Sequence, residues 1–175
     1  MSRKKSKPDG GQQSPNRYKR NTRAGGILFN EDLTEILLIK GKMHKKWGVP
    51  KGHIEKYESD LCGGLREILE ETGIPILIGM MGNSHKTIPY IRVQKTKLFV
   101  FYLIKDKFRL VPDDTNEIEE IGWKKISELG ELDADSTTKM LKVIIKHLET
   151  AKSKTQTIKC LSINNVLLVN PTILN

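Results

Sequence analysis

Residues 52–74 read GHIEKYESDLCGGLREILEETGI and carry the most informative pattern of the chain. It predicts a helix over 59–72, because Ser59 is a suitable N-cap and Gly73, followed by Pro75, ends a helix. At about 100° per residue, one face of this helix is apolar and turns to a core: Leu61, Leu65, Ile68 and Leu69. The opposite face carries three carboxylates within one turn: Glu67, Glu70 and Glu71.

The three carboxylates have two explanations. Glutamate is a good helix former, so a solvated acidic face is the simpler one, although like charges one turn apart repel each other. Clustered hard oxygen ligands also suit magnesium or manganese, whose coordination shell is often completed by substrate phosphates. The preceding residues 47–52, WGVPKG, favour the metal, because this Gly- and Pro-containing loop directs its backbone toward the same helix face.

The flanking sequence predicts a layered α/β fold. Strands are expected at 25–29, 36–39, 76–78, 90–93, 98–104 and 118–123. The run 98–104 is continuously apolar, which is typical of a central strand covered on both faces. A second amphipathic helix is expected over 136–150, with its inward face formed by Met140, Leu141, Ile144, Ile145 and Leu148. Strands and helices interleave, so the sequence predicts a sheet packed between helices.

The positive charge is concentrated at one end of the chain. The 175 residues carry a net charge of +9 and suit a single domain. Residues 1–23 contain eight Lys or Arg and one Asp, which leaves only +2 for the other 152 residues. We therefore predict a disordered basic arm at 1–21, a domain at 22–150 and an extension of unknown structure at 151–175. The arm suits a nucleic acid, an acidic protein or a localisation receptor.

Several classes of protein are excluded by composition. No apolar run approaches the roughly 20 residues that span a bilayer, and the basic N-terminus lacks the apolar segment of a secretory signal. Cys62 and Cys160 lie 98 positions apart, without the spacing of a metal site. We expect a reduced, cytoplasmic protein without a membrane partner.

Residues 52–74 resemble the Nudix box, Gly-x5-Glu-x7-Arg-Glu-U-x-Glu-Glu-x-Gly-U, in which U is a bulky aliphatic residue. Every fixed position matches: Gly52, Glu58, Arg66, Glu67, Ile68, Glu70, Glu71, Gly73 and Ile74. The resemblance extends over about 22–150 and implies the Nudix fold, a mixed β-sheet sandwiched between helices. It also implies hydrolysis of a nucleoside diphosphate linked to another group, with magnesium or manganese as cofactor.

The resemblance also implies roles for the box residues. The metal ligands would be the backbone carbonyl of Lys51 and three carboxylates: Glu67, Glu70 and Glu71. Glu71 is the candidate that helps to deprotonate water, which a metal makes more acidic. The remaining box residues would support the loop structurally: Gly52, Glu58, Arg66 and Gly73. Arg66 and Glu58 would form a salt bridge that holds the box loop on the helix.

The flanks resemble the mRNA-decapping Nudix enzymes. Residues 47–52 are similar to their Trp-Gly-Phe-Pro-Lys-Gly, and residues 116–123 to their Asn-Glu-Ile-x-x-Ile-x-Trp. The second similarity implies that Glu117 is a further catalytic and metal-binding carboxylate, although Glu119 and Glu120 are close alternatives. The helix 136–150 resembles the basic RNA-binding helix of these enzymes through Lys139, Lys142 and Lys146. A lysine stripe is also typical of a solvated face.

Two further residues have open interpretations. Trp47 either contacts substrate or packs under the sheet. His53 belongs to Pro-Lys-Gly-His-x-Glu, which resembles the diadenosine polyphosphate hydrolases, and it either contacts substrate phosphate or caps the loop. Lys51, just before the box glycine, is a candidate for binding substrate as well as metal.

The leading hypothesis is a metal-dependent hydrolase that removes the 5′ cap, or opens the 5′ polyphosphate end, of RNA and leaves a 5′-monophosphate. Only residues 1–21 precede the domain, where cellular decapping enzymes carry a helical regulatory domain, so the resemblance is to the compact decapping proteins of some large DNA viruses. The alternative substrates are diadenosine polyphosphates, nucleoside triphosphates and diphosphoinositol polyphosphates. A non-enzymatic alternative is an RNA-binding protein on a Nudix scaffold.

Overall fold

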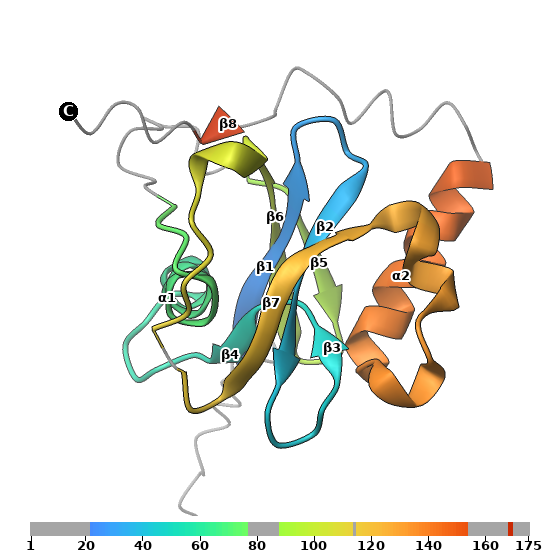
Figure 1. Ribbon diagram of the computed structural model, residues 1–175. Coiled ribbons are helices and arrows are strands. Elements are labelled where there is room, and N and C mark those ends of the chain that lie inside the picture. The colour runs from blue at the N-terminus through green and yellow to red at the C-terminus, as the bar shows by residue number, and fades with distance from the viewer. Residues whose placement is uncertain (1–21, 77–87, 114, 154–167, 170–175) are drawn as a thin grey trace, which may run out of the picture.

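A computed structural model describes residues 22–76, 88–113, 115–153 and 168–169. In this part of the chain, a mixed sheet has the path β3-β2-β1-β6-β5, with β4 paired to β1, β7 to β2 and β8 to β6 (Figure 1). The strands are β1 Arg23–Asn30, β2 Glu35–Gly41, β3 Trp47–Gly48, β4 Lys51–His53, β5 Tyr90–Val93, β6 Thr96–Leu103, β7 Ile118–Lys125 and β8 Leu168–Val169. The arm predicted at 1–21 and most of the extension predicted at 151–175 lie outside the described residues.

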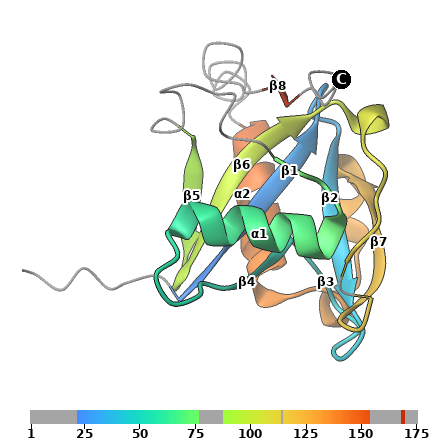
Figure 2. The ribbon, with the colours of Figure 1, turned by 90° about the vertical axis from the view of Figure 1, so that its left-hand side faces the viewer.

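Two α-helices cover opposite faces of the sheet (Figures 1 and 2). Helix α1, Asp60–Thr72, packs on the face that contains Leu28 and Leu37 of the central strands. Helix α2, Lys139–Ser153, packs on the face that contains Ile27 and Ile36. Alternate residues of β1 and β2 thus supply the two cores, as the period of a strand requires. The predicted sandwich of a mixed sheet between helices is confirmed.

Strand β6 has the central position that its continuous apolar run predicted. It pairs parallel with β1 through Arg23↔Thr96 to Asn30↔Leu103 and antiparallel with β5. Leu98 faces the α2 core and Phe101 faces the α1 core, and both are fully buried. A strand was predicted at 76–78. Ile76 does not belong to a strand, and residues 77–78 lie outside the described part of the chain.

The start of the second helix was predicted wrongly. The chain forms a 3-10 turn at Ala134–Ser136, and α2 begins only at Lys139. The physical reason is tertiary: Thr137 bridges to Trp47, and the backbone N–H of Thr138 donates to the Trp47 carbonyl at 2.9 Å. The hydroxyl of Thr138 then accepts from Leu141 N at 3.2 Å and acts as the N-cap. The predicted inward face is confirmed, with Leu141 and Ile144 buried.

The remaining elements are short connections or differ only in their bounds. Two further 3-10 segments, Lys105–Lys107 and Ile126–Glu131, flank β7, which continues two residues beyond its predicted end because it pairs with the whole of β2. No helix in the described ranges is long and apolar enough to cross a membrane.

Candidate active site

A pocket of about 620 Å³ opens between α1, β4, the β2–β3 turn and the loop that precedes β7. Its lining includes all four carboxylates singled out in the sequence: Glu67, Glu70, Glu71 and Glu117. The predicted supporting and substrate residues Lys51, Gly52, His53 and Arg66 line it as well. Residues separated by up to 66 positions in sequence therefore meet in one cavity.

Helix α1 is fixed at both ends by the residues that the sequence predicted as its boundaries. Ser59 Oγ accepts from the N–H of Cys62 at 3.1 Å, and Gly73 has φ 73° while its N–H donates to the Leu69 carbonyl. The helix approaches β1 closely, because a Cβ on Gly64 would lie 3.2 Å from backbone atoms of Gly25. Leu69 was predicted to belong to the buried apolar face of this helix. It lies at the edge of that face and is 39% exposed.

Glu71 is the carboxylate whose pKa is shifted furthest. Burial raises the pKa of Glu71 to about 8, and the nearby charges of Glu67 and Glu117 add to this rise. A hydrogen bond from the backbone N–H of Lys51 to Glu71 Oε2, at 2.6 Å, opposes it in part. Glu71 is thus held in place by β4 but is costly to ionise without a neighbouring cation.

Glu67 lies against the backbone of Gly52. Its side chain is 12% exposed, and a Cβ on Gly52 would come within 2.0 Å of Glu67 Oε2, so a larger residue here would push the carboxylate out of this position. Burial raises the pKa of Glu67, while an ion pair with Arg66 at 3.0 Å lowers it in part. The box glycine therefore allows the carboxylate to lie against the backbone of β4.

Arg66 joins the box loop to the helix, as the resemblance implied. Its Nε and Nη2 donate to the two oxygens of Glu58, both at 3.1 Å, and Nη2 also donates to the His53 carbonyl at 2.8 Å. The guanidinium holds the pKa of Glu58 below its usual value. Arg66 Nη1 contacts Glu67 and, at 2.8 Å, Glu70. One arginine thus orients three carboxylates.

The structure separates the three candidate carboxylates at the start of β7. Glu117 lines the pocket and raises the pKa of Glu71 through its charge. Glu119 instead forms ion pairs with Lys40 and Lys45, and Glu120 forms one with Lys124 at 3.6 Å. The geometry therefore favours Glu117, as the sequence resemblance did.

The donor set of the pocket suits a divalent cation. Four carboxylates and a backbone carbonyl are hard oxygen ligands, and burial raises the pKa of both Glu67 and Glu71, so a nearby cation would favour their ionised forms. Among the described residues, no three acidic, histidine or cysteine side chains are gathered tightly enough to form a metal cage. Arg66 engages Glu67 and Glu70 in this arrangement. The match between this pocket and a divalent cation therefore rests on the chemistry of the donors and on their location in one pocket.

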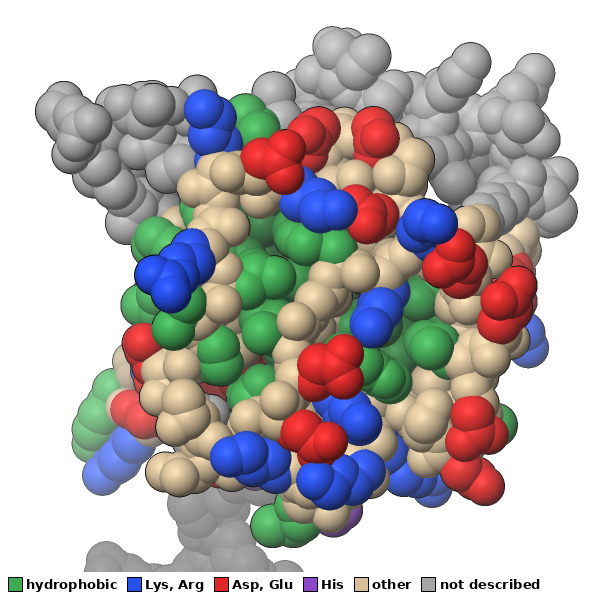
Figure 3. Space-filling model, in the orientation of Figure 1, with side chains coloured by type: hydrophobic (Ala, Val, Ile, Leu, Met, Phe, Trp, Pro, Cys, Tyr) green, Lys and Arg blue, Asp and Glu red, His purple; other side chains and the backbone are tan. Residues whose placement is uncertain are grey.

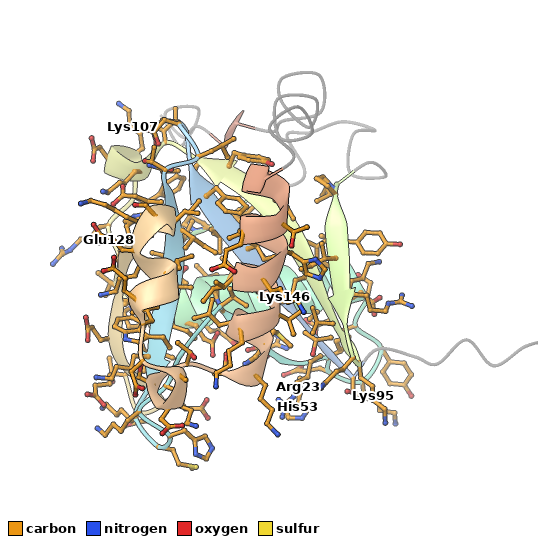
Figure 4. The ribbon with its side chains drawn as sticks, turned by 90° about the vertical axis from the view of Figure 1, so that its right-hand side faces the viewer. Arg23, His53, Lys95, Lys107, Glu128 and Lys146 are labelled. Atoms are coloured by element: carbon orange, nitrogen blue, oxygen red, sulfur yellow. The ribbon has the colours of Figure 1, made fainter. Side chains whose placement is uncertain are left out.

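The other predicted substrate residues lie in different places. Trp47 is 7% exposed and packs in the α2 core, with Lys124 Nζ 4.1 Å from its ring, so the packing interpretation describes it. The predicted lysines of α2 are all exposed: Lys139, Lys142 and Lys146. Lys146 is visible on the outer side of the helix in Figure 4. Whether these lysines bind RNA stays a prediction.

Two parts of the pocket lining were missed from the sequence. Arg23 reaches the pocket from the first residue of β1, although the sequence grouped it with the basic arm. The β2–β3 turn contributes Met43, His44 and Lys46, which carry no recognisable local signal. The turn is fastened to the Glu117 loop, since Lys42 N donates to the Glu117 carbonyl at 2.8 Å. Figure 3 shows basic side chains gathered along this lower edge of the molecule.

Known proteins share both the sequence pattern and the fold. A family model described as the NUDIX domain matches residues 19–145. The m7GpppN-mRNA hydrolase of Saccharomyces cerevisiae is 34% identical over 107 residues, which cover 59% of this chain and 11% of the yeast protein. The asymmetrical bis(5′-nucleosyl)-tetraphosphatase of Sus scrofa is 37% identical over 76 residues, 42% of this chain and 51% of the pig protein.

A solved MutT NUDIX hydrolase from Burkholderia pseudomallei superposes with a TM-score of 0.52 at 18% identity, covering 71% of this chain and 94% of that one. This likeness concerns the fold alone. The aligned region spans only about a tenth of the yeast relative's length, so what that whole protein does is not transferred by the match.

Proposed function

The chain belongs to the Nudix family, and from this membership we propose that it is a metal-dependent hydrolase of the 5′ cap, or of the 5′ polyphosphate end, of RNA. Water would add to a phosphorus of the anhydride while the P–O bond breaks. A nucleoside diphosphate would leave from capped RNA, and the RNA would retain a 5′-monophosphate. The observation that carries this proposal is the convergence of Glu67, Glu70, Glu71 and Glu117 on one pocket.

The residues of the pocket have distinct tasks in this reaction. Magnesium or manganese, held by the four carboxylates and the Lys51 carbonyl, would neutralise phosphate charge and acidify a bound water. The Lys51 N–H fixes one oxygen of Glu71, the proposed proton acceptor. Buried Val49, Ile39 and Ile118 line the pocket and exclude bulk water from that side. Arg66 and Glu58 hold the loop geometry.

RNA is proposed as the substrate for two reasons. The S. cerevisiae relative is named an mRNA hydrolase, and its identity extends over 107 residues. The chain also has exposed lysines on α2 and a basic N-terminal segment at 1–21, and such residues supply affinity for a long phosphate backbone. A cytoplasmic location remains part of the proposal.

A second candidate is the hydrolysis of diadenosine polyphosphates. The similarity to the pig tetraphosphatase and the sequence Pro50-Lys51-Gly52-His53 favour it. The pocket volume of about 620 Å³ admits a nucleotide in either case.

A substrate panel distinguishes the two candidates. Turnover is compared, with magnesium or manganese, on capped RNA, free cap dinucleotide and diadenosine tetraphosphate. An RNA enzyme has a higher kcat/KM on the capped RNA, and this advantage falls steeply with added salt. Equal or better turnover of the two small substrates would reject RNA as the preferred substrate and leave the dinucleotide hydrolase.

A further inference from the structure

Arg23 and His53 form a hydrogen-bonded pair at the edge of the pocket. Arg23 Nε donates to His53 Nε2 at 3.4 Å, and both side chains line the cavity. The pair follows from the strand register, because β1 and β4 run antiparallel with Arg23 opposite His53. The backbone N–H of Arg23 also donates to the Lys95 carbonyl at 3.3 Å. Arg23 therefore projects from a strand that is fixed on both sides.

The terminal nitrogens of Arg23 are available to bind a ligand. Within the described residues, Arg23 makes only the bond through Nε, so its two terminal nitrogens keep their N–H groups free. His53 accepts at Nε2, which leaves Nδ1 as the other polar atom of its ring. Arg66, the other arginine of the pocket, is already committed to Glu58, Glu67 and Glu70. The guanidinium of Arg23 can therefore donate two parallel hydrogen bonds, a geometry that matches a phosphate.

Positive charge continues from this pair along one side of the molecule. In the view of Figure 4, Arg23, His53 and Lys95 are labelled at one end of the molecule and Lys146 on α2, so all four residues are seen from this side. Lys95 and Lys146 are exposed and have no ion pair within the described ranges. The basic residues of 1–21 precede Arg23 directly in the sequence. The surface therefore leads away from the pocket with the sign that an RNA backbone requires.

Resting on the proposed function, we infer that Arg23, oriented by His53, binds the first backbone phosphates of the RNA at the edge of the pocket, where the chain leaves it. The RNA chain then crosses the face that Arg23, Lys95 and Lys146 share. On this path Arg23 contacts RNA beyond the cap dinucleotide and so distinguishes a long substrate from a short one. The competing account is that Arg23 only braces His53 and the β1–β4 pairing.

The test compares Arg23→Gln and Arg23→Lys with the wild type on capped RNA and on free cap dinucleotide. Arg23→Gln lowers kcat/KM for capped RNA about tenfold more than for the dinucleotide, mainly through KM, and makes the log–log salt slope shallower by about one. Arg23→Lys restores the salt slope but only part of the affinity, because an ammonium lacks the planar fork. Lys107→Gln is the matched control, since Lys107 is exposed at the opposite end of the molecule in Figure 4.

The outcomes separate this inference from the proposed function. A wild-type protein that cleaves dinucleotides but not capped RNA overturns both. A wild type that cleaves capped RNA, with Arg23→Gln equal to Lys107→Gln on it, overturns the inference alone. Equal losses on both substrates from Arg23→Gln also overturn the inference, because they assign Arg23 to bracing the pocket.

Discussion

At the residue scale, Glu71 links the stability of the protein to its chemistry. Burial raises the pKa of Glu71 to about 8, and the single hydrogen bond from Lys51 offsets only part of this rise. An ionised carboxylate in such a place weakens the metal-free fold, and a cation would remove the penalty. The residue best suited to the reaction is therefore expected to be a poor choice for stability alone.

Replacing Glu71 by Gln tests this expectation. The pKa of Glu71 in the wild type rises from 4.5 to about 8 on folding, so the folded protein holds this proton more tightly than the unfolded chain. The stability that this proton contributes is lost as pH rises from about 4.5 to about 8. The loss approaches about 1.4 kcal/mol per pH unit. In chelator, Glu71→Gln unfolds with less pH dependence and exceeds the wild type in stability near pH 8. Its hydrolysis rate falls by about a hundredfold or more.

The control for this prediction is Glu128→Gln, which removes an exposed carboxylate paired with Lys125. Denaturant unfolding is followed between pH 5 and pH 8 for all three proteins. A Glu71→Gln protein that matches Glu128→Gln in pH dependence would contradict the raised pKa of Glu71.

Tyr57 provides a second test at this scale. It adopts φ 71° in the box loop, a conformation that costs a residue with a Cβ about 1 kcal/mol, and its side chain is 88% exposed. Tyr57→Gly should therefore raise the free energy of unfolding by up to about 1 kcal/mol, measured by urea denaturation. Tyr57→Ala keeps the Cβ and should change it by less than about 0.5 kcal/mol. Equal effects of the two variants would assign the gain to loss of the ring.

At the scale of elements, the approach of α1 to β1 sets the position of the acidic face. Gly64 allows this contact, since an added Cβ would lie 3.2 Å from Gly25 N and O and from the Phe99 ring. Helix α1 would otherwise stand further from β4, where Lys51 N reaches Glu71. The geometry of the proposed active site therefore depends on a close helix–strand packing as much as on the carboxylates.

Gly64→Ala measures that packing. Alanine favours a helix by about 1 kcal/mol over glycine, but overpacking at this contact costs about 1–3 kcal/mol. We expect a net loss of about 1 kcal/mol in the free energy of unfolding, together with lower kcat. Gly122→Ala in β7, where a Cβ meets nothing within 4 Å, is the matched control and should be neutral. A stabilising Gly64→Ala would show that α1 can shift freely on the sheet.

The elements that could be predicted from the sequence are those whose signals are local. Helix α1 carries its cap, apolar period and stop within residues 59–73, so its bounds followed to within one residue. The start of α2 could not be predicted in this way, because it is set by a hydrogen bond from Thr138 to Trp47, which is distant in sequence. The Arg23–His53 pair was missed for the same reason: it joins residues 30 positions apart through a register that local sequence does not reveal. Glu117 was identified by resemblance, and the structure then separated it from Glu119 and Glu120.

At the scale of the whole molecule, charge is divided between an acidic pocket and basic surroundings. The pocket carboxylates repel a polyphosphate unless a cation intervenes, whereas the exposed lysines of α2 and the residues of 1–21 attract it. On the proposed function, the net charge of +9 would therefore serve the binding of a long polyanion more than the reaction itself.

Neutralising the N-terminal segment tests this division in the full-length chain. Replacing the seven Lys and Arg residues of 1–21 by Gln should weaken binding of 5′-monophosphate RNA at low salt and make its salt dependence shallower. Fluorescence anisotropy at several salt concentrations gives the slope. An unchanged slope would assign the segment to another partner.

The four pocket carboxylates are proposed to hydrolyse capped RNA together with a divalent cation. The most direct measurement is the rate of nucleoside diphosphate release from capped RNA by the wild type and by the Glu117→Gln and Glu119→Gln variants. We expect metal-dependent release with a 5′-monophosphate RNA as the other product. The rate should fall about a hundredfold or more in Glu117→Gln and be largely retained in Glu119→Gln. Release that is equally reduced, or equally retained, in these two variants would contradict it.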